Sequence, residues 1–372
     1  MKANKKKIAL VVSDLSLNGV FFVKVTLARE FIRLGFEVDI ITGYISEDVS
    51  DLIPEECGIY ELGLLRLNSF AYKLGKYLRA NKPVALIASS WPCTAAAILS
   101  SRLFHSKAKL LVIEHVDFRT NFYVSGEFSR KDIFLISYFG KYIYNAADVV
   151  VGVSTGVVDG LKNYAKIDDS KLKVIYNPLR CFSSITKSQT TQSIKDLIWT
   201  QGTTKILSVG RLAYQKAYEE LIRAIGLINN RDKLRLIIIG DGSLREVLEK
   251  QIENLGLQKN IFLIGSISEP EIFYEDADLF VLSSSSEGFG NVIIEALSYG
   301  VPVVSTDCKS GPAEILGNGR WGDLVMVGDT VALAKSIESA LSKKHDHEAL
   351  RNRANDFSPE RVARQYLAAL RL

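Results

Sequence analysis

Short apolar runs alternate with stretches of helical periodicity along most of the chain. Before residue 180 the apolar runs are residues 8–12, 38–42, 85–89, 110–113, 149–153 and 173–175, and after residue 200 they are 205–209, 234–239, 261–263, 279–282 and 303–305. Runs of this length, nearly continuous and separated by helical segments, are typical of parallel strands covered by helices on both faces. The pattern therefore predicts an α/β protein with parallel sheets.

One polar stretch interrupts the alternation. Residues 181–203 are rich in Ser and Thr, which is typical of a linker or an exposed excursion. We therefore expect one α/β domain over residues 1–180, a linker over 181–203 and a second α/β domain over 204–357. The final segment, residues 358–372, has Ser358 as an N-cap and Pro359 at the first helical position, and it predicts a terminal helix.

The net charge of the chain bears on whether it binds nucleic acid. The 372 residues include 46 Lys and Arg against 42 Asp and Glu, and a net charge of +4 is small for a protein that binds nucleic acid through its phosphates. We expect no nucleic-acid partner. Residues 1–180 carry 24 basic against 18 acidic residues, so the positive excess lies in the first half.

Neither the cysteines nor the apolar runs indicate export. Cys57, Cys93, Cys181 and Cys308 lie far apart without a C-x-x-C pair, which suits reduced thiols in a cytoplasmic protein. The first apolar run ends after about five residues, too short for a signal-peptide core, and no apolar stretch approaches the roughly 20 residues that span a bilayer. A cytoplasmic protein, soluble or peripheral to a membrane, is expected.

The most informative segment is residues 283–307, SSSSEGFGNVIIEALSYGVPVVSTD. It begins where an apolar strand ends, and it places Glu287 before a turn and Glu295 in the following helix. Ligands of open α/β sheets bind at the carboxyl ends of strands, and carboxylates accept hydrogen bonds from sugar or ribose hydroxyls. The alternative is an ordinary strand-turn-helix with solvated glutamates.

The same turn has the features of a phosphate site. Gly288 and Gly290 let the backbone approach a ligand closely, and the N–H groups near Asn291 and Val292 lie at a helix start, where they can hold phosphate oxygens. By contrast, Gly240-Asp241-Gly242 is a weak signal taken alone, and we expect a tight turn between strand and helix there.

This Glu-x7-Glu pattern, with its EGFGN core and ALSYGVPVVSTD, resembles the motif of retaining glycosyltransferases of family 4, which have the GT-B fold. Other segments resemble the family in the same order: residues 110–118, 174–179, 208–224, 237–250, 261–272 and 308–316. The resemblance covers nearly the whole chain. It implies two Rossmann-like domains that face each other across a cleft, an acceptor-binding one at 1–180 and a donor-binding one at 204–357, with the terminal helix crossing back to the first.

The resemblance also implies site residues. Arg211 and Lys216, in SVGRLAYQKAYEELIRA, would stabilise the departing diphosphate, as two cations after a strand can. His115, at the end of LLVIEH, would lie beside the donor sugar, although a lone histidine there is more often structural. Glu287 would hold the donor sugar and Glu295 the ribose. Further donor-binding residues would be Gly19, Gly288, Phe289, Gly290, Asn291, Val292 and Ile267.

The glycine-rich loop of the first half departs from the family pattern. Where the family commonly has two adjacent glycines, this chain has Asn18 and Gly19, and Asn tolerates a positive φ, so the loop shape could survive. Phe21 and Phe22 replace residues that are often polar, which puts the acceptor contacts in doubt.

The expected function is transfer of a hexose or N-acetylhexosamine from a nucleotide sugar, UDP-linked by preference, with retention of configuration. Family analogy favours a glycan or polyprenyl-diphosphate-linked acceptor in bacterial cell-envelope biosynthesis. No cofactor and no metal are expected, because Asp276-Ala277-Asp278 precedes a strand where the family has an ordinary Asp. Basic and aromatic residues interleave over 64–82 and 130–144, which is consistent with helices that cover a sheet or with contact at the inner face of an anionic plasma membrane.

Alternatives from other classes stay open. A sugar-nucleotide epimerase is disfavoured by the Glu-x7-Glu with its two cations, and a glycan phosphorylase by the lack of a PLP-lysine signature. A sugar-binding protein of the periplasmic type would need an export signal. An inactive GT-B subunit, or a sugar-nucleotide-binding protein of a glycan assembly complex, should have lost charged site residues that this chain keeps.

Overall fold

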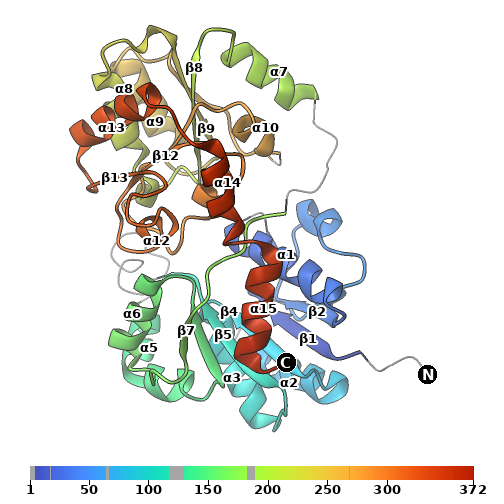
Figure 1. The fold of residues 1–372 in the computed structure, drawn as a ribbon. Coiled ribbons are helices and arrows are strands. Elements are labelled where there is room, and N and C mark those ends of the chain that lie inside the picture. Colours follow the sequence, from blue (N-terminus) through green and yellow to red (C-terminus); the bar gives the residue numbers. More distant parts are fainter. Residues whose placement is uncertain (1–4, 17, 64–66, 117–129, 182–188, 268) are drawn as a thin grey trace. The chain divides into compact units, whose positions relative to one another are not determined.

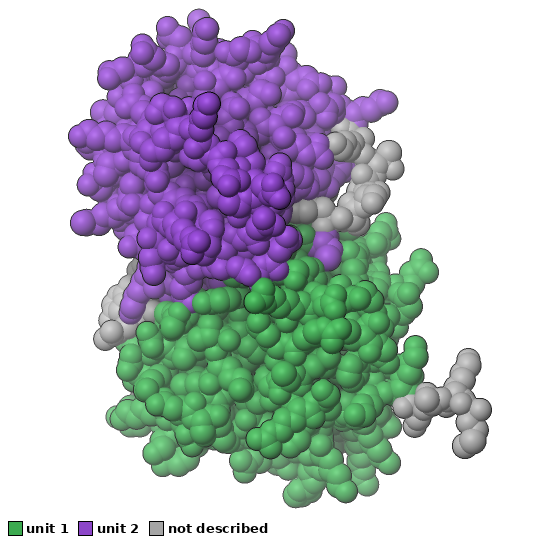
Figure 2. Space-filling view, viewed as in Figure 1, with its two compact units in different colours: residues 1–180, 357–372 green, residues 181–356 purple. Residues whose placement is uncertain are grey.

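The computed structural model describes residues 5–16, 18–63, 67–116, 130–181, 189–267 and 269–372. They form two compact units, each built around its own parallel sheet (Figure 1). Unit 1 comprises residues 1–180 and 357–372, and unit 2 comprises residues 181–356 (Figure 2). The chain therefore leaves unit 1 once and returns to it for its last helix.

Seven parallel strands form the sheet of unit 1, in the order β3-β2-β1-β4-β5-β6-β7. The central strands are buried along nearly their whole length, which explains why the sequence shows them as unbroken apolar runs. The edge strand β3 alternates between half-buried and exposed residues, and the apolar pattern does not reveal it. The strands are β1 (Lys7–Val11), β2 (Glu37–Thr42), β3 (Gly58–Glu61), β4 (Ala85–Ser89), β5 (Lys109–Glu114), β6 (Val149–Gly152) and β7 (Leu172–Val174).

Helices connect these strands, and the one after β1 shows how the sequence sets their ends. Helix α1 begins after Asn18, whose side-chain oxygen accepts a hydrogen bond from the Phe21 N–H at 2.9 Å. It ends before Gly35, which has φ +94°. The helices of unit 1 are α1 (Gly19–Arg33), the 3-10 helix η1 (Glu47–Leu52), α2 (Leu67–Asn81), α3 (Cys93–Leu103), α5 (Arg130–Tyr144), α6 (Thr155–Ala165) and α15 (Pro359–Leu370).

The last helix, α15, packs in unit 1 although nearly two hundred residues separate it from β7. Its apolar stripe, which includes Val362 and Tyr366, is buried, and α15 contacts α1. At the surface, Arg33 and Glu360 form an ion pair of 2.7 Å. The returning chain is fixed by the Leu179 N–H, which donates to the Phe357 carbonyl at 2.8 Å.

Six parallel strands form the sheet of unit 2, in the order β10-β9-β8-β11-β12-β13. The strands are β8 (Thr204–Val209), β9 (Leu234–Ile239), β10 (Ile261–Leu263), β11 (Leu279–Leu282), β12 (Val303–Thr306) and β13 (Asp323–Val325). Its helices are α7 (Gln189–Ile198), η2 (Tyr214–Lys216), α8 (Tyr218–Leu227), η3 (Arg231–Lys233), α9 (Arg245–Asn254), α10 (Glu271–Tyr274), α11 (Asn291–Ser298), α12 (Pro312–Ile315), α13 (Thr330–Ser342) and α14 (His347–Asn355).

The segment expected as a linker, residues 181–203, differs from the prediction. Its second half forms helix α7, which belongs to unit 2. The buried Lys195 donates to the Ile272 carbonyl at 3.2 Å and pairs with Asp276 at 2.5 Å, and the Trp199 ring packs against Phe273. Few apolar residues anchor this helix, so its Ser and Thr content hides it in the sequence. Residues 182–188 lie outside the described residues.

Within the described ranges, no helix is both long and apolar enough to cross a bilayer.

Candidate functional site

Each sheet has a switch point, where successive connections run to opposite sides. In unit 2 this point lies between the neighbouring strands β8 and β11, because the chain continues from β8 to β9 on one side and from β11 to β12 on the other. The two strands pair in parallel, with Ile206 opposite Leu279. Open α/β sheets bind ligands outside the carboxyl ends of the strands at such a point. Two loops of unit 2 meet there: the loop after β8, which contains η2, and the loop after β11.

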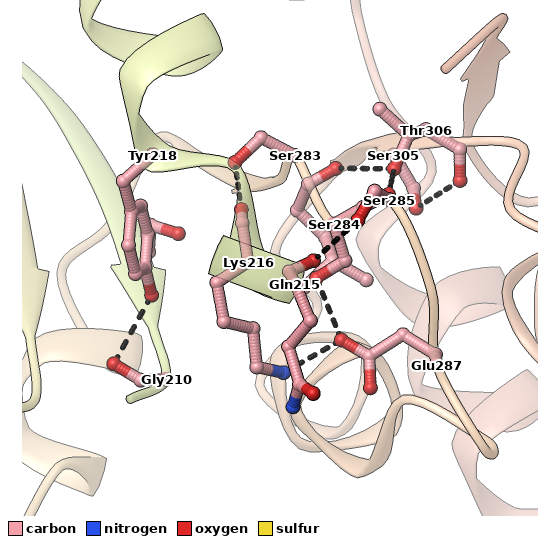
Figure 3. Close-up of polar contacts among 12 residues, drawn as sticks. Gly210, Gln215, Lys216, Tyr218, Ser283, Ser284, Ser285, Glu287, Ser305 and Thr306 are labelled. Atoms are coloured by element: carbon pink, nitrogen blue, oxygen red, sulfur yellow. Dashed lines mark hydrogen bonds and ion pairs between the residues drawn. The ribbon is translucent and has the colours of Figure 1, made fainter. Parts of the chain in front are cut away.

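Hydrogen bonds tie these two loops together. The Ser285 N–H donates to the Gln215 carbonyl at 2.8 Å, and the Ser283 hydroxyl donates to the Lys216 carbonyl, also at 2.8 Å (Figure 3). Both serines therefore hold the backbone of η2 against the end of β11. The run of serines after this strand thus has a structural role that the sequence alone does not reveal.

Lys216 and Glu287 meet across these loops. Lys216 Nζ lies 2.6 Å from Glu287 Oε1, and the Ser284 hydroxyl donates to the same oxygen at 2.7 Å (Figure 3). The two charged side chains are 14% and 11% exposed, so water screens the pair less than it would at the surface. The sequence predicted both residues, and the structure brings them into direct contact.

The backbone beside Arg211 is fixed from two sides, while its side chain is exposed. The Tyr218 hydroxyl donates to the Gly210 carbonyl at 3.3 Å (Figure 3). From β9, Gly240 approaches with φ +142°, and a Cβ there would overlap the Gly210 carbonyl oxygen. A Cβ on Gly242 would likewise overlap the carbonyl oxygen of Leu212, the residue after Arg211. The glycines predicted to form a tight turn thus support the segment that carries Arg211.

The residues from Glu287 to Glu295 differ in burial and in their position relative to helix α11. Gly290, with φ +99°, precedes α11, so Asn291 and Val292 lie in the first turn, where N–H groups have no intrahelical acceptor. Glu295 is buried and accepts a hydrogen bond from the Tyr274 hydroxyl at 3.0 Å. The half-buried Gly288 lies between Glu287 and this helix, and Ile267 is half-buried beyond the end of β10.

Phe289, expected among the donor-binding residues, packs its side chain into unit 2. Its side chain is buried in unit 2, where a Cβ on Gly311 would overlap the Phe289 backbone. The ring therefore contributes to packing, and only its main chain is positioned like the rest of the turn.

In unit 1, Gly19 is exposed and begins α1. Its neighbour Asn18 has φ −147°, so it does not adopt the positive φ that asparagine tolerates, and it acts as the N-cap of α1. The two phenylalanines that replace polar residues also have structural contacts: Phe21 is buried, and the Arg180 guanidinium lies 3.5 Å from the centre of the Phe22 ring.

His115 follows β5 and is buried in unit 1. Its Nε2 atom has no hydrogen-bond partner among the described residues. Burial, with the nearby positive charge of Lys24, lowers the pKa of His115 to about 3. The imidazole is therefore neutral at physiological pH, and it can act on a ligand by hydrogen bonding but not as a cation.

The sequence analysis missed Glu114, which precedes His115. Its fully buried carboxylate accepts hydrogen bonds from the Thr94 hydroxyl at 3.0 Å, the Tyr144 hydroxyl at 2.8 Å and the Trp91 N–H at 3.4 Å. Burial raises its pKa to about 7, although these hydrogen bonds act in the opposite direction. Glu114 thus joins the start of α3 and the end of α5 to β5. A glutamate inside the apolar run LLVIEH is the signal that could have identified it.

No group of three or more His, Cys, Asp or Glu side chains is arranged to hold a metal ion in the part of the chain that the structure describes. The Asp-x-Asp sequence has other contacts. Asp276 pairs with Lys195 at 2.5 Å, and Asp278 accepts a hydrogen bond from the Lys205 N–H at 2.8 Å. Because both precede β11, they lie at the opposite edge of the sheet from Glu287.

Two family models match this chain. Residues 17–181 match "Glycosyltransferase Family 4", and residues 189–357 match "Glycosyl transferases group 1". The chain is also 29% identical, over 98% of its length and 99% of the other, to the N-acetylgalactosamine-N,N'-diacetylbacillosaminyl-diphospho-undecaprenol 4-alpha-N-acetylgalactosaminyltransferase of Campylobacter jejuni.

Solved structures share the fold. A glycosyltransferase from Rickettsia africae has a TM-score of 0.82 at 21% identity, covering 99% of this chain and 98% of its own. HepE of Anabaena, solved in complex with UDP and glucose, has a TM-score of 0.79 at 19% identity, covering 98% and 99%. With the two family models and the two parallel-sheet units, these similarities show that the chain is a glycosyltransferase of family 4 with the GT-B fold.

Proposed function

We propose that this glycosyltransferase moves a hexose or N-acetylhexosamine from a nucleotide sugar, UDP-linked by preference, to a hydroxyl of a glycan or polyprenyl-diphosphate-linked acceptor in bacterial cell-envelope biosynthesis. The observation that carries this proposal is the Lys216–Glu287 pair at the switch point of unit 2. Lysine is a common ligand of phosphates, and a carboxylate accepts hydrogen bonds from sugar hydroxyls, so this pair supports both parts of the proposed donor site. The names of the relatives support the substrates, since HepE was solved with UDP and the Campylobacter enzyme is named for a diphospho-undecaprenol acceptor.

Each site residue has a role in this proposal. Lys216 and Arg211 stabilise the negative charge that develops on the departing diphosphate, and Glu287 accepts hydrogen bonds from the donor sugar. Glu295 accepts from the ribose, and neutral His115 hydrogen-bonds a sugar hydroxyl. Backbone groups complete the donor contacts, at Gly19, Ile267, Gly288, Phe289, Gly290, Asn291 and Val292.

The proposed reaction retains the anomeric configuration. The bond from the anomeric carbon to the phosphate oxygen breaks while the acceptor oxygen bonds to the same face of that carbon, and the acceptor proton passes to the departing phosphate. No protein nucleophile takes part in this route. Positioning and electrostatic stabilisation therefore supply most of the catalysis, and we propose that no metal is needed.

A donor screen tests this proposal. The full chain is incubated with UDP-, GDP- and dTDP-linked sugars and an acceptor extract, and mass spectrometry detects transfer or donor hydrolysis. We expect turnover of a UDP-linked sugar, an α-linked product by NMR and full activity in EDTA. A β-linked product would contradict retention, and strict Mn²⁺ dependence would contradict the metal-independent route. Binding without turnover of any donor would favour the inactive-subunit alternative.

We also propose that unit 1 contacts an anionic membrane surface. On α5, Tyr138, Phe139 and Tyr142 are exposed large hydrophobic residues, with the exposed Lys141 between them. Such a mixture of aromatic and basic side chains suits the interface of an anionic bilayer. On α2, Lys76 lies over the exposed Tyr72 ring, 4.7 Å from its centre.

Vesicle sedimentation tests this contact. We expect the chain to bind vesicles with 30% phosphatidylglycerol, by weight, more tightly than vesicles of phosphatidylcholine alone. Replacing Phe139 and Tyr142 by Ser should weaken binding severalfold. The control is Leu197→Ser, which removes an exposed apolar side chain from unit 2. Equal binding of all variants to both vesicles would exclude this surface.

A further inference from the structure

Helix α1 carries a lysine where its pattern calls for an apolar residue. Phe21, Ala28 and Phe31 are buried along the helix, and Lys24 falls within this buried face. The whole Lys24 side chain is inaccessible to solvent, and its Nζ atom has no hydrogen-bond partner within the described residues. An isolated buried ammonium group lowers stability considerably, so folding alone gives no reason to keep it.

Two more unpartnered polar atoms lie at the same edge of the sheet. They are the Ser89 hydroxyl, at the end of β4, and His115 Nε2, just after β5, and both belong to buried side chains. In the register of β4 and β5, Ser89 lies opposite Ile113, two residues before His115. Lys24 interacts electrostatically with His115, which follows β5, and with Cys93, which begins α3 after β4. Lys24 therefore lies close to both residues.

This edge is the switch point of unit 1. In the sheet order, β1 and β4 are neighbours, while β1 leads on to β2 and β4 leads on to β5. Side chains of a helix tilt toward its N-terminus, so Lys24 points from α1 toward the carboxyl end of β1. There the N–H groups of Gly19 and Val20, in the first turn of α1, have no intrahelical acceptor, and the helix dipole adds positive potential.

The surroundings do not balance the charge of Lys24. Cys93, on α3, is a buried thiol whose pKa is raised by burial, so it is neutral, and His115 is neutral too. The nearest acidic side chains that act on Cys93 have other hydrogen bonds: Asp14 accepts from the Ser13 and Ser16 hydroxyls, and Glu114 from Thr94, Tyr144 and Trp91. Both carboxyl groups act on Cys93, but neither pairs with Lys24, whose Nζ atom has no hydrogen-bond partner among the described residues.

We propose that Lys24, Ser89 and the first turn of α1 form a phosphate-binding site at the switch point of unit 1, beside His115. A phosphate oxygen supplies the acceptor that each of these donors lacks, and lysine is a common ligand of phosphate. The inference rests on the proposed function, because the nucleotide-sugar donor and a polyprenyl-diphosphate-linked acceptor of that reaction both carry a diphosphate. It adds a second phosphate contact to the one expected at Lys216.

The protonation of Lys24 provides a direct readout. Burial lowers its pKa to about 7, so the empty site holds less than one proton on this amine at neutral pH. A bound phosphate favours the ammonium form and raises this pKa. Binding should therefore take up protons near pH 7.5, which titration calorimetry detects as a heat that depends on the ionisation enthalpy of the buffer.

The test compares Lys24→Met with the wild-type full chain. Methionine fills the same volume without a charge, so we expect a higher Tm, because the unpaired ammonium is gone. Affinity for inorganic pyrophosphate should fall roughly 10- to 100-fold, and the proton uptake should disappear. The control, Lys162→Met, removes an exposed lysine that pairs with Asp169, and it should change none of these measurements.

Two arms identify the source of the phosphate. If Lys24 holds the donor diphosphate, Lys24→Met weakens the binding of UDP but not of uridine. If Lys24 holds the acceptor diphosphate, Lys24→Met leaves the affinity for UDP unchanged. It then weakens only the binding of pyrophosphate measured in the presence of saturating UDP. Either result supports the site. Unchanged affinity for UDP and for pyrophosphate in both conditions would overturn it.

A second variant tests whether Lys24→Met changes ligand affinity only by altering the structure around it. Ser89→Ala deletes one hydroxyl and should weaken the same ligand by roughly 3- to 10-fold. These are binding measurements, so they remain valid if no donor is turned over. Failure of the transferase proposal is then distinguishable from failure of this site.

Discussion

The two units present a lysine at corresponding switch points, but in opposite electrostatic states. In unit 2, Lys216 has a carboxylate partner, Glu287, whose oxygen also receives the Ser284 hydroxyl. In unit 1, Lys24 is more deeply buried and has no partner among the described residues. The paired lysine is held ready in one position before any ligand arrives. The unpaired one lowers the stability of the folded protein when it is charged, and a bound phosphate would compensate for that charge.

The largest expected effect is a loss of kcat when the Lys216–Glu287 pair of unit 2 is broken. Lys216→Met and Glu287→Gln should each lower kcat for donor turnover by roughly 10²- to 10³-fold, because each removes a group expected to act on the developing charge or the donor sugar. Circular dichroism should show an unchanged fold. The control is Asp241→Asn, which breaks an exposed ion pair with Arg245 in the same unit.

For this first prediction, the control should retain kcat within about twofold, as an exposed pair contributes little. Near-normal kcat in both Lys216→Met and Glu287→Gln would remove this pair from the proposed reaction. The comparison between the two lysines would then lose its catalytic meaning.

Next in size is an effect on the support of Arg211. Gly240→Ala should destabilise unit 2 by about 3 kcal/mol or more, since the new Cβ overlaps the Gly210 carbonyl at a positive φ. Gly256→Ala is the matched control: Gly256 also has a positive φ, +65°, but no atom near its Cβ position, so about 1 kcal/mol is expected. Urea unfolding followed by tryptophan fluorescence measures both, because Trp199 and Trp321 lie in unit 2. Equal losses would show that the backbone near Arg211 does not depend on this close approach.

A third prediction concerns the buried acid of unit 1. The pKa of Glu114 is raised from 4.5 to about 7, so its stabilising effect is complete below pH 4.5 and is lost as the pH rises through 7. The full change is about 3 kcal/mol. Glu114→Gln should therefore flatten the fall in stability of unit 1 between pH 5 and 7.5, as measured by urea unfolding with Trp91 fluorescence. The same slope in both proteins would show that Glu114 titrates normally.

The smallest expected effect is a change in stability that distinguishes Lys195, a buried lysine with a partner, from Lys24. Lys195→Met should destabilise unit 2 by about 1 kcal/mol, because the 7% exposed Lys195 loses its contacts with Asp276 and the Ile272 carbonyl. This is opposite in sign to the expected rise in Tm for Lys24→Met. Lys162→Met, in an exposed pair, should leave thermal unfolding unchanged. A loss of stability in Lys24→Met as well would mean that Lys24 has a structural partner after all.

These contrasts also show what the sequence could reveal. Buried parallel strands such as β1 and β11 are continuous apolar runs, so both sheets were predictable. The edge strands β3 and β13 were not, because exposure on one side interrupts their apolar pattern. Helix α7 was missed for a related reason: it attaches by few side chains, and one of them is a lysine.

For the site, the resemblance predicted residues of unit 2 that motifs mark, such as Lys216 and Glu287, which form an ion pair in the structure. It could not identify residues whose importance depends on burial. Lys24 and Glu114 look like ordinary charges in the sequence, and only their depth in unit 1 reveals them. Phe289 is the reverse case, since it lies within the motif but is buried.

The return of the chain to unit 1 affects how the protein can be synthesised. Phe357–Leu372 belongs to unit 1, yet the whole of unit 2 precedes it in the chain. During translation, unit 2 is synthesised before α15, so the surface of α1 that α15 covers stays open until α15 has been made. Residues 1–180 expressed alone would leave the same apolar surface uncovered. The first unit to be translated is thus the last to finish folding.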